Sequence, residues 1–325
     1  MRTIRWGIIG CGDVTEVKSG PGFQKAEGSA LVAVMRRDGE KARDYARRHG
    51  VPRAYDRAND LIADPDVDAV YIATTPSSHC DLALRVAAAG KPCLVEKPMG
   101  LNHQECLRMI EAFDAERLPL WVAYYRRALP RFLAVRDCLR ENRIGRLTSV
   151  HVQVTAPLLT GSDAGWRVDA ATSGGGLFFD LASHCFDLLD FLVGPITQVS
   201  GFAVNTGGAY ASEDGTAAAF EFNRRTIGTG IWNFNASEKT DFITFTGSEG
   251  ELQTPIFSDT DVVLTRGSER RVYELRNPPH VHQPLIQTIV DELRGEGRCA
   301  SSAESAARTS WVLDRCVAGY YGRRP

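Results

Sequence analysis

Residues 4–12, Ile-Arg-Trp-Gly-Ile-Ile-Gly-Cys-Gly, join a short apolar run to a glycine turn. A segment with helical character follows, and the chain returns as a second apolar run, Leu31-Val-Ala-Val-Met35. A strand, a glycine turn, a helix and a strand make one βαβ unit, in which the glycines let the backbone approach a pyrophosphate. Thr15 stands where the full fingerprint has a third glycine, so an ordinary strand-to-helix turn is the alternative. The residues predicted to bind a nucleotide are Gly10, Cys11, Gly12, Asp13 and Val14.

The end of the second predicted strand indicates which cofactor binds. NAD-binding proteins usually place an acidic residue there to hold the ribose 2′-hydroxyl, but this chain reads Met35-Arg36-Arg37-Asp38. Arginine suits a 2′-phosphate through a bidentate, charge-assisted contact. We therefore predict NADP rather than NAD, held at Arg36 and Arg37, with two solvated surface arginines as the alternative. Asp38 is expected to face solvent or to cap the next helix.

Strands and helices keep alternating after the first βαβ unit. Strands are predicted over 68–73, 92–96 and 119–124, with helices over 80–89 and 102–115. This alternation predicts an α/β domain over residues 1–124 with a doubly wound parallel sheet, whose ligands bind outside the carboxyl ends of the strands. The residues expected at that edge are Thr74, Pro76, His79, Glu96 and Lys97. A lysine there either acts as an acid or base or only hydrogen-bonds a ribose hydroxyl.

A glycine-rich run in the second half, Gly174-Gly-Gly-Leu-Phe-Phe-Asp-Leu-Ala-Ser-His-Cys-Phe-Asp187, precedes a predicted helix over 177–193. Asp180, His184 and Asp187 fall at positions i, i+4 and i+7, so they share one face of a helix that is otherwise mostly apolar. Buried ionisable groups are costly unless they are paired or line a wet cleft. A catalytic cleft is favoured over a buried polar network, and a metal-binding role for Asp187 is the weaker alternative.

From residue 125 to 325 the pattern is typical of an α+β domain. Strand-like segments are predicted over 147–156, 196–206, 214–223, 227–235, 240–247, 261–266 and 271–275. Helices are predicted near 130–141, 283–294 and 302–318, and the last two are expected to pack back against the domains. His280 and His282 lie in a proline-rich loop without a nearby acid, which favours loop packing over metal binding.

Composition excludes several classes of protein. The 325 residues carry a formal net charge of −2, which predicts no electrostatic footprint for nucleic acid or an anionic membrane. No apolar run is long enough to span a bilayer, and the start of the chain runs directly into a strand without the pattern of a signal peptide. The eight cysteines have no metal-binding spacing and are expected to be reduced and buried, which predicts a cytoplasmic protein.

These features together resemble the glucose–fructose oxidoreductase/inositol dehydrogenase (Gfo/Idh/MocA) family. The resemblance is carried by residues 7–12, 63–76, 89–99, 166–167, 174–184, 194–195, 247–250 and 283–286. It implies Lys97 as the proton-transfer lysine, with Asp180 and His184 as the other members of the catalytic set. Trp166 and Arg167 resemble a pair that reaches the cofactor in NADP-using members.

The resemblance also bears on the cofactor and on assembly. Residues 32–38 are similar to the dihydrodiol dehydrogenase and anhydrofructose reductase branch, which uses NADP, and this implies Arg37 as the more favoured phosphate ligand. For the second half of the chain, the resemblance implies one open, mostly antiparallel sheet, and in the family a second subunit covers the wide face of this sheet. A homodimer or homotetramer formed through this sheet is therefore expected.

The combined prediction is an NADP-dependent oxidoreductase. It would transfer hydride between nicotinamide C4 and a secondary alcohol or carbonyl of a sugar, cyclitol or related polyol. Two alternatives stay open: a redox-neutral glycoside hydrolase that uses tightly held NAD, and a non-catalytic nucleotide-sensing regulator on the same fold.

Overall fold

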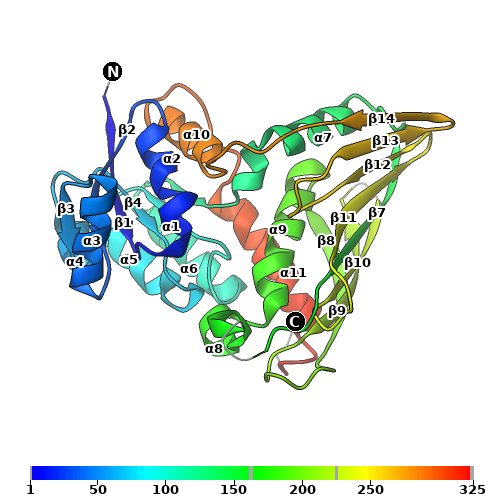
Figure 1. Cartoon of the computed structure of the whole chain (residues 1–325), viewed down its shortest axis with the longest axis horizontal. Helices are drawn as coiled ribbons and strands as arrows, with labels where there is room; N and C mark the ends of the chain where they lie inside the picture. The colour runs from blue at the N-terminus through cyan, green and yellow to red at the C-terminus, as the bar shows by residue number, and fades with distance from the viewer. Residues whose placement is uncertain (1, 161–163, 224–225, 323–325) are drawn as a thin grey trace. The chain divides into compact units, whose positions relative to one another are not determined.

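The chain forms two compact units. The computed structural model describes residues 2–160, 164–223 and 226–322 (Figure 1). The first unit comprises Met1–Ala128 with Pro278–Ala307, and the second comprises Leu129–Asn277 with Arg308–Pro325. The first holds a six-stranded sheet and the second an eight-stranded one, which confirms the predicted fold class.

The sheet of the first unit is parallel throughout, in the order β3-β2-β1-β4-β5-β6. Its strands are β1 (Ile4–Ile9), β2 (Ser29–Met35), β3 (Arg53–Tyr55), β4 (Ala69–Ile72), β5 (Cys93–Val95) and β6 (Leu120–Val122). The accompanying helices are α1 (Asp13–Val17), α2 (Gly20–Lys25), α3 (Gly39–His49), α4 (Ala58–Ala63), α5 (His79–Ala88), α6 (His103–Ala115) and α10 (Gln283–Leu293), with short 3₁₀ turns η1 (Pro76–Ser78) and η2 (Tyr125–Ala128). Strand β3 was not predicted, because three half-buried residues carry almost no periodic signal.

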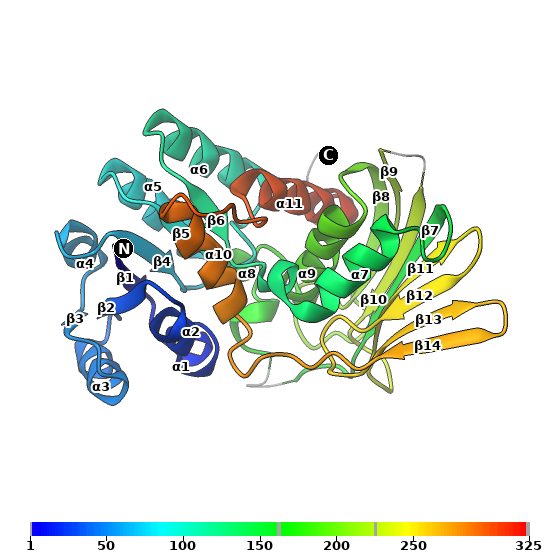
Figure 2. The ribbon, with the colours of Figure 1, turned by 90° about the horizontal axis from the view of Figure 1, so that it is seen from above.

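Both faces of this sheet are covered, which explains why its strands read as continuous apolar runs. Helices α4, α5 and α6 contribute to the core on one face, and α2, α3 and α10 to the core on the other (Figure 2). On the second face Trp6 and Phe23 rings lie 4.8 Å apart, and Phe23 lies 5.1 Å from Tyr71. Alternating side chains of β4, such as Val70 and Tyr71, therefore enter different cores.

Residues 278–307 belong to the first unit. The sequence grouped them with residues 125–325 and expected the last helices to pack back against the domains. The physical reason is the apolar stripe of α10, because Leu285, Ile286 and Ile289 are fully buried in the same core as Trp6. Periodicity indicated this helix but does not reveal which sheet a helix covers.

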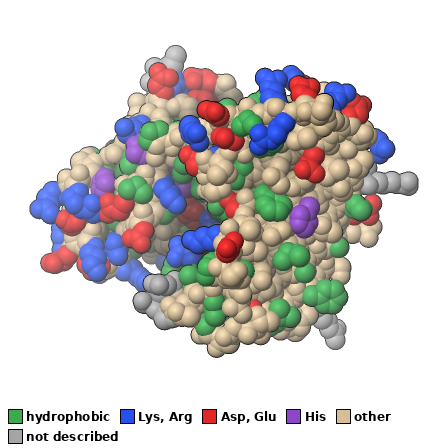
Figure 3. Space-filling view, turned by 45° about the vertical axis from the view of Figure 1, so that its right-hand side comes forward, with side chains coloured by type: hydrophobic (Ala, Val, Ile, Leu, Met, Phe, Trp, Pro, Cys, Tyr) green, Lys and Arg blue, Asp and Glu red, His purple; other side chains and the backbone are tan. Residues whose placement is uncertain are grey.

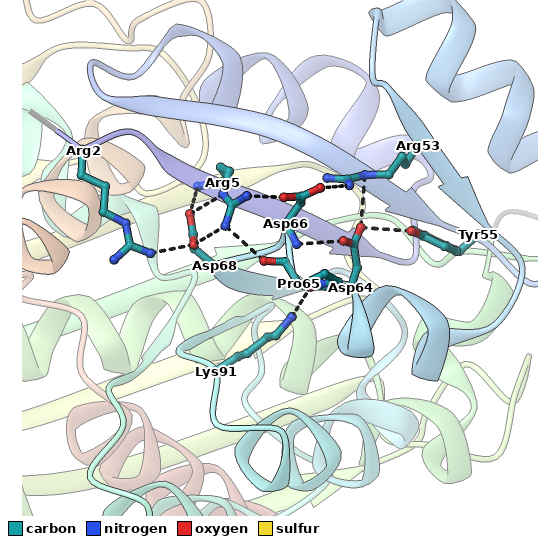
Figure 4. A network of polar contacts seen from close by, with 9 residues as sticks. All are labelled: Arg2, Arg5, Arg53, Tyr55, Asp64, Pro65, Asp66, Asp68 and Lys91. Atoms are coloured by element: carbon teal, nitrogen blue, oxygen red, sulfur yellow. Dashed lines mark hydrogen bonds and ion pairs between the residues drawn. The ribbon is translucent and has the colours of Figure 1, made fainter.

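A polar network ties the amino ends of these strands together (Figure 4). Asp68, just before β4, accepts hydrogen bonds from the backbone N–H and the guanidinium of Arg5 and from Arg2. Asp64 is buried and accepts from the Tyr55 hydroxyl at 3.0 Å. The further members are Arg53, Pro65, Asp66 and Lys91. The network therefore lies at the amino edge of the sheet, opposite the carboxyl edge that is predicted to bind the ligand.

The sheet of the second unit runs in the order β14-β13-β12-β11-β7-β10-β9-β8. Its strands are β7 (Leu147–Thr155), β8 (Ile196–Val204), β9 (Gly215–Phe222), β10 (Ile227–Asn233), β11 (Thr240–Gly247), β12 (Glu251–Thr254), β13 (Val262–Arg266) and β14 (Glu269–Tyr273). All neighbouring pairs are antiparallel except β7 and β10, which run parallel. Strand β12 was not predicted, since it follows β11 after a tight turn and is only four residues long.

One face of this second sheet packs against helices. These are α7 (Pro130–Arg140), α9 (Leu177–Leu192) and the part of α11 (Ala303–Val317) that follows Ala307, with η4 (Gly165–Val168) and α8 (Ala170–Ser173) nearby in the chain (Figure 2). Phe178 and Phe186 of α9 each lie 5.1 Å from the Trp232 ring of β10. The aromatic contacts explain why α9 is apolar on most of its surface.

The other face of this sheet exposes apolar side chains. Phe202 of β8 is 79% exposed and Ile231 of β10 is 48% exposed, and both lie in the same row because each is paired with Ala217 of β9. Ile227 and Val204 are also exposed. Figure 3 shows hydrophobic side chains with few charged ones over this region.

No helix within the described ranges is long and apolar enough to cross a bilayer.

Candidate active site

The glycine turn after β1 needs glycine at one position and leaves open space at another. Gly10 has a positive φ of +92°, and a Cβ there would lie 2.7 Å from Thr74 Cγ2, so only glycine fits. At Gly12 a Cβ would meet nothing nearer than 3.9 Å, which leaves the backbone open to a ligand. Thr15 donates its hydroxyl to Gly12 O at 2.7 Å and accepts from Gly12 N–H at 3.0 Å. The threonine therefore tightens the turn from the position where the fingerprint has its third glycine.

The arginines after β2 are both exposed, and one of them reaches the glycine turn. Arg36 Nη1 lies 3.4 Å from the carbonyl oxygen of Cys11. Asp38 accepts a hydrogen bond from the backbone N–H of Lys41 at 3.2 Å and caps α3, as predicted. The acid is thus engaged in the helix cap, and a guanidinium lies beside the glycine turn.

His79 connects two of the loops at the carboxyl edge of the sheet. Its Nδ1 lies 3.0 Å from Pro98 O and its Nε2 lies 3.0 Å from Thr74 O. Because carbonyls only accept, both contacts are hydrogen bonds only when both ring nitrogens carry protons. Burial lowers the pKa of His79, so its neutral form keeps one of the two bonds. Pro76 is buried between these loops.

Glu96, one residue after β5, is a buried carboxylate held by three donors. The Tyr71 hydroxyl and His282 Nε2, at 3.2 Å, both contact Oε1, and the Lys97 backbone N–H donates to Oε2 at 3.1 Å. Burial alone would raise the pKa of Glu96, but the hydrogen bond and charge of His282, together with Tyr71 and the charge of Lys97, bring it below its ordinary value. Glu96 is therefore an anion beside Lys97, whose own side chain is half-buried.

The second unit carries the remaining predicted site residues on α9 and in the turn before it. The Asp180 side chain is 14% exposed, and the residues His184 and Asp187 are 5% and 1% exposed. Arg167 Nε donates to Asp180 Oδ2 at 3.1 Å, and its guanidinium lies 4.7 Å from the centre of the Trp166 ring. Asp180 is thus a partly exposed carboxylate paired with an exposed arginine, which is an arrangement suited to contacting a ligand.

The amino end of α9 is held by a buried acid that the sequence did not single out. Gly176 donates its N–H to Glu213 Oε1 at 2.8 Å, and Glu213 also accepts from the Tyr321 hydroxyl. A Cβ at Gly176 would lie 2.4 Å from Glu213 O, so this glycine permits the close approach. The contact fixes where the helix carrying Asp180 begins.

The proline-loop histidines have different environments. His280 Nδ1 lies 2.9 Å from Val17 O, and His282 is buried with its ring 4.3 Å from that of Tyr125. Within the described ranges no group of three or more His, Cys, Asp or Glu side chains is arranged to hold a metal ion. The contact of His282 with Glu96 was missed, because no local pattern links positions 186 residues apart.

Comparison with known proteins then decides the family. Residues 4–124 match the profile of the oxidoreductase family with an NAD-binding Rossmann fold, and residues 132–253 match the GFO/IDH/MocA C-terminal domain. Oxidoreductase P35 of Formosa agariphila is 37% identical over 315 residues, covering 96% of this chain and 97% of the relative. The chain belongs to the GFO/IDH/MocA family.

Two further comparisons extend the likeness. The 1,5-anhydro-D-fructose reductase of Ensifer adhaerens is 26% identical, with 95% of this chain and 93% of the relative covered. Levoglucosan dehydrogenase in complex with NADH shares the fold, with a TM-score of 0.88, 20% identity, and 99% and 98% of the two chains covered. The resemblance seen in the sequence is confirmed, and the protein is an oxidoreductase.

For this GFO/IDH/MocA member, the structure distributes the predicted site residues between the two units. The first unit brings the following to the carboxyl edge of its sheet: Gly10, Cys11, Gly12, Asp13, Val14, Arg36, Arg37, Thr74, Pro76, His79, Glu96 and Lys97. The second unit carries Trp166, Arg167, Asp180 and His184. Glu96 accepts the backbone N–H of Lys97, and His79 contacts the carbonyl oxygens of Thr74 and Pro98, so both side chains help to shape the loops around Lys97.

Proposed function

We propose that this oxidoreductase uses NADP and acts on a secondary alcohol, or the corresponding carbonyl, of a sugar, cyclitol or related polyol. The observation that carries the cofactor choice is the Arg36 guanidinium beside Cys11 O, at the end of a β2 strand that lacks a free acid. The substrate class is supported by the 1,5-anhydro-D-fructose reductase and levoglucosan dehydrogenase named above.

The residues present fit a dinucleotide. The space over Gly12 admits a pyrophosphate against the backbone, and Arg36 with Arg37 would hold a 2′-phosphate. Thr74 and Pro76 would border the cofactor from the loop after β4, and Trp166 and Arg167 are the further residues proposed to bind it. When bound, the nicotinamide supplies or accepts hydride at C4.

Lys97 is the proposed proton-transfer group. In the oxidative direction it accepts the proton of the substrate hydroxyl, and in the reductive direction it returns that proton to the carbonyl oxygen. His184 is the alternative acceptor, and Asp180 would orient the group that carries the proton. Glu96, the preceding residue, accepts the backbone N–H of Lys97 at 3.1 Å, which supports a fixed position for the segment that carries the lysine.

A side-by-side titration with NADPH and NADH tests the cofactor, with tryptophan quenching and nicotinamide emission as readouts. Selective binding of NADPH is expected, and a preference for NADH would refute the 2′-phosphate assignment. Turnover is then measured as NADPH oxidation with 1,5-anhydro-D-fructose and as NADP⁺ reduction with levoglucosan.

The same assays separate the alternatives. A redox-neutral hydrolase would cleave a glycoside with no net change in nicotinamide absorbance. A regulator would bind the nucleotide and show no turnover with any of these sugars. Either result would replace the proposed activity.

We also propose that two copies pair through the exposed face of the second-unit sheet. The observation that supports this is the row containing Phe202 and Ile231, because exposed apolar side chains that lie side by side on a sheet are typical of an interface. Isologous pairing of this face in a homodimer, or in a homotetramer built from such dimers, would bury both side chains.

A cytoplasmic location is proposed on the state of the cysteines. All eight are buried free thiols, and burial raises the pKa of Cys11 to about 11. Such thiols suit a reducing compartment. Eight titratable thiols after denaturation of protein purified without reductant would agree with this, and disulfide-linked pairs would contradict it.

A further inference from the structure

His282 meets the site from a distant part of the chain. It lies at the start of α10, is 2% exposed, and places Nε2 3.2 Å from Glu96 Oε1 although 186 residues separate the two. Glu96 immediately precedes Lys97 in the chain, so His282 contacts the residue next to the proposed proton-transfer lysine.

The ring of His282 is fixed in orientation. It packs on Tyr125, with centroids 4.3 Å apart and planes inclined by 37°. Its Nδ1 has no hydrogen-bonding partner among the described residues, so Glu96 is the polar group that it engages. Since a carboxylate only accepts, the bond requires Nε2 of His282 to carry a proton.

Glu96 links His282 to the backbone of Lys97, because each of them contacts one of its two carboxylate oxygens. Its Oε1 is held by Tyr71 and His282, and its Oε2 accepts the Lys97 N–H at 3.1 Å. Partners on one carboxylate oxygen set the direction of the other, because the two oxygens turn as a rigid plane. On the far side of Lys97, His79 contacts the carbonyl of Pro98. The peptide that carries the lysine is therefore held by Glu96 on its amino side, and by His79 on its carboxyl side in the tautomer that has its proton on Nδ1.

We propose that His282 is a positioning residue for Lys97 and acts through Glu96. Its hydrogen bond keeps the buried carboxylate ionised and correctly turned, so the Lys97 peptide keeps one conformation during turnover. The inference rests on the proposed function of Lys97. It predicts that substitutions of His282 lower kcat more than they change the affinity for the cofactor.

The first test follows kcat in four variants. His282→Leu and His282→Asn should lower kcat about 10–100-fold, as is typical for loss of a supporting hydrogen bond, while NADPH affinity changes less than about twofold. His282→Gln should restore most of kcat, because its amide nitrogen reaches the position of Nε2, whereas that of asparagine does not. His280→Leu, in the same loop, is the matched control and should behave as wild type. Turnover is measured with NADPH and 1,5-anhydro-D-fructose, or with NADP⁺ and levoglucosan.

A double variant separates positioning from general structural damage. In a Lys97→Ala background, His282→Leu should cause no further loss of kcat, because the residue on which it acts is gone. A further 10-fold loss, or equal kcat in the Gln and Leu variants, would overturn the proposal. If Lys97→Ala alone keeps wild-type turnover, the proposed function of Lys97 fails instead.

A second readout does not depend on turnover. Amide hydrogen exchange of the peptide spanning residues 93–100 reports the Lys97 N–H bond to Glu96. Exchange should be at least about 10-fold faster in His282→Leu and His282→Asn than in His282→Gln, His280→Leu and wild type. Unchanged exchange in all variants would overturn the link through Glu96 even if kcat fell.

Discussion

Arg36 Nη1 lies 3.4 Å from the carbonyl oxygen of Cys11, and this contact joins the end of β2 to the glycine turn after β1. The sequence favoured Arg37 as the phosphate ligand by family resemblance. In the structure both arginines are exposed, and the guanidinium of Arg36 is the one that contacts the turn. The cofactor preference is therefore expected to depend on both side chains.

Single substitutions test this dependence. Arg36→Ala and Arg37→Ala should each weaken NADPH binding about 10–100-fold, the loss expected for a charge-assisted hydrogen bond of about 1.5–3 kcal/mol. Binding of NADH should change less than about threefold, since it has no 2′-phosphate. Fluorescence titration gives both dissociation constants. Equal losses for the two cofactors would contradict the assignment, and Arg43→Ala, on the exposed side of α3, is the control.

Replacement of Lys97 tests the proton-transfer role. Lys97→Ala should lower kcat about 10²–10⁴-fold, the usual contribution of a general acid or base, while NADPH still binds. Lys91→Ala is a matched control, because Lys91 precedes the same strand and donates to Asp64 O at the opposite edge of the sheet. Steady-state kinetics should show near-normal kcat for the control. Comparable losses in both variants would point to general damage.

The amino-edge network predicts how stability depends on pH. Desolvation opposes ionisation of Asp68, but its bonds to Arg5 and Arg2 outweigh this and lower its pKa from 3.8 to about 2. A carboxylate with a depressed pKa stabilises the fold at pH above about 4, and this contribution is lost as the pH falls toward about 2.

Asp68→Asn should therefore reduce stability by about 1 kcal/mol at pH 7, a value kept small because Arg2 is largely exposed. Thermal unfolding of both proteins from pH 7 to pH 2 should show the difference shrinking below pH 4. A difference that stays constant over this range would contradict the pairing. Asp66→Asn, whose carboxylate is 55% exposed, should have a smaller effect.

The exposed sheet face predicts an assembly that a charge should disrupt. Phe202→Lys would place an ammonium where an apolar contact is proposed, so the dimer should dissociate to a monomer at micromolar concentration. Sedimentation velocity measures the change. Leu107→Lys, at a 48% exposed position on α6, is the control and should leave the assembly intact. A dimeric Phe202→Lys protein would exclude this face as the interface.

Local patterns in the chain were sufficient for the class of fold and for most of the residues proposed for the site. The glycine turn at Gly10, the strand before Lys97 and the helix bearing Asp180 each depend on neighbouring residues, and all three form where predicted. These features could be predicted because the spacing of apolar residues and the presence of turn-forming residues are local properties of a few neighbouring positions.

Other features depend on contacts between distant segments, which only the tertiary structure decides. The sequence contained no sign that His282 bonds Glu96, that β7 and β10 run parallel, or that α10 covers the first sheet rather than the second. The local sequence around a histidine in a proline loop is the same whether its imidazole faces solvent or a buried carboxylate. Its partner is selected by how the apolar stripe of α10 docks, and that docking is a property of the packed core.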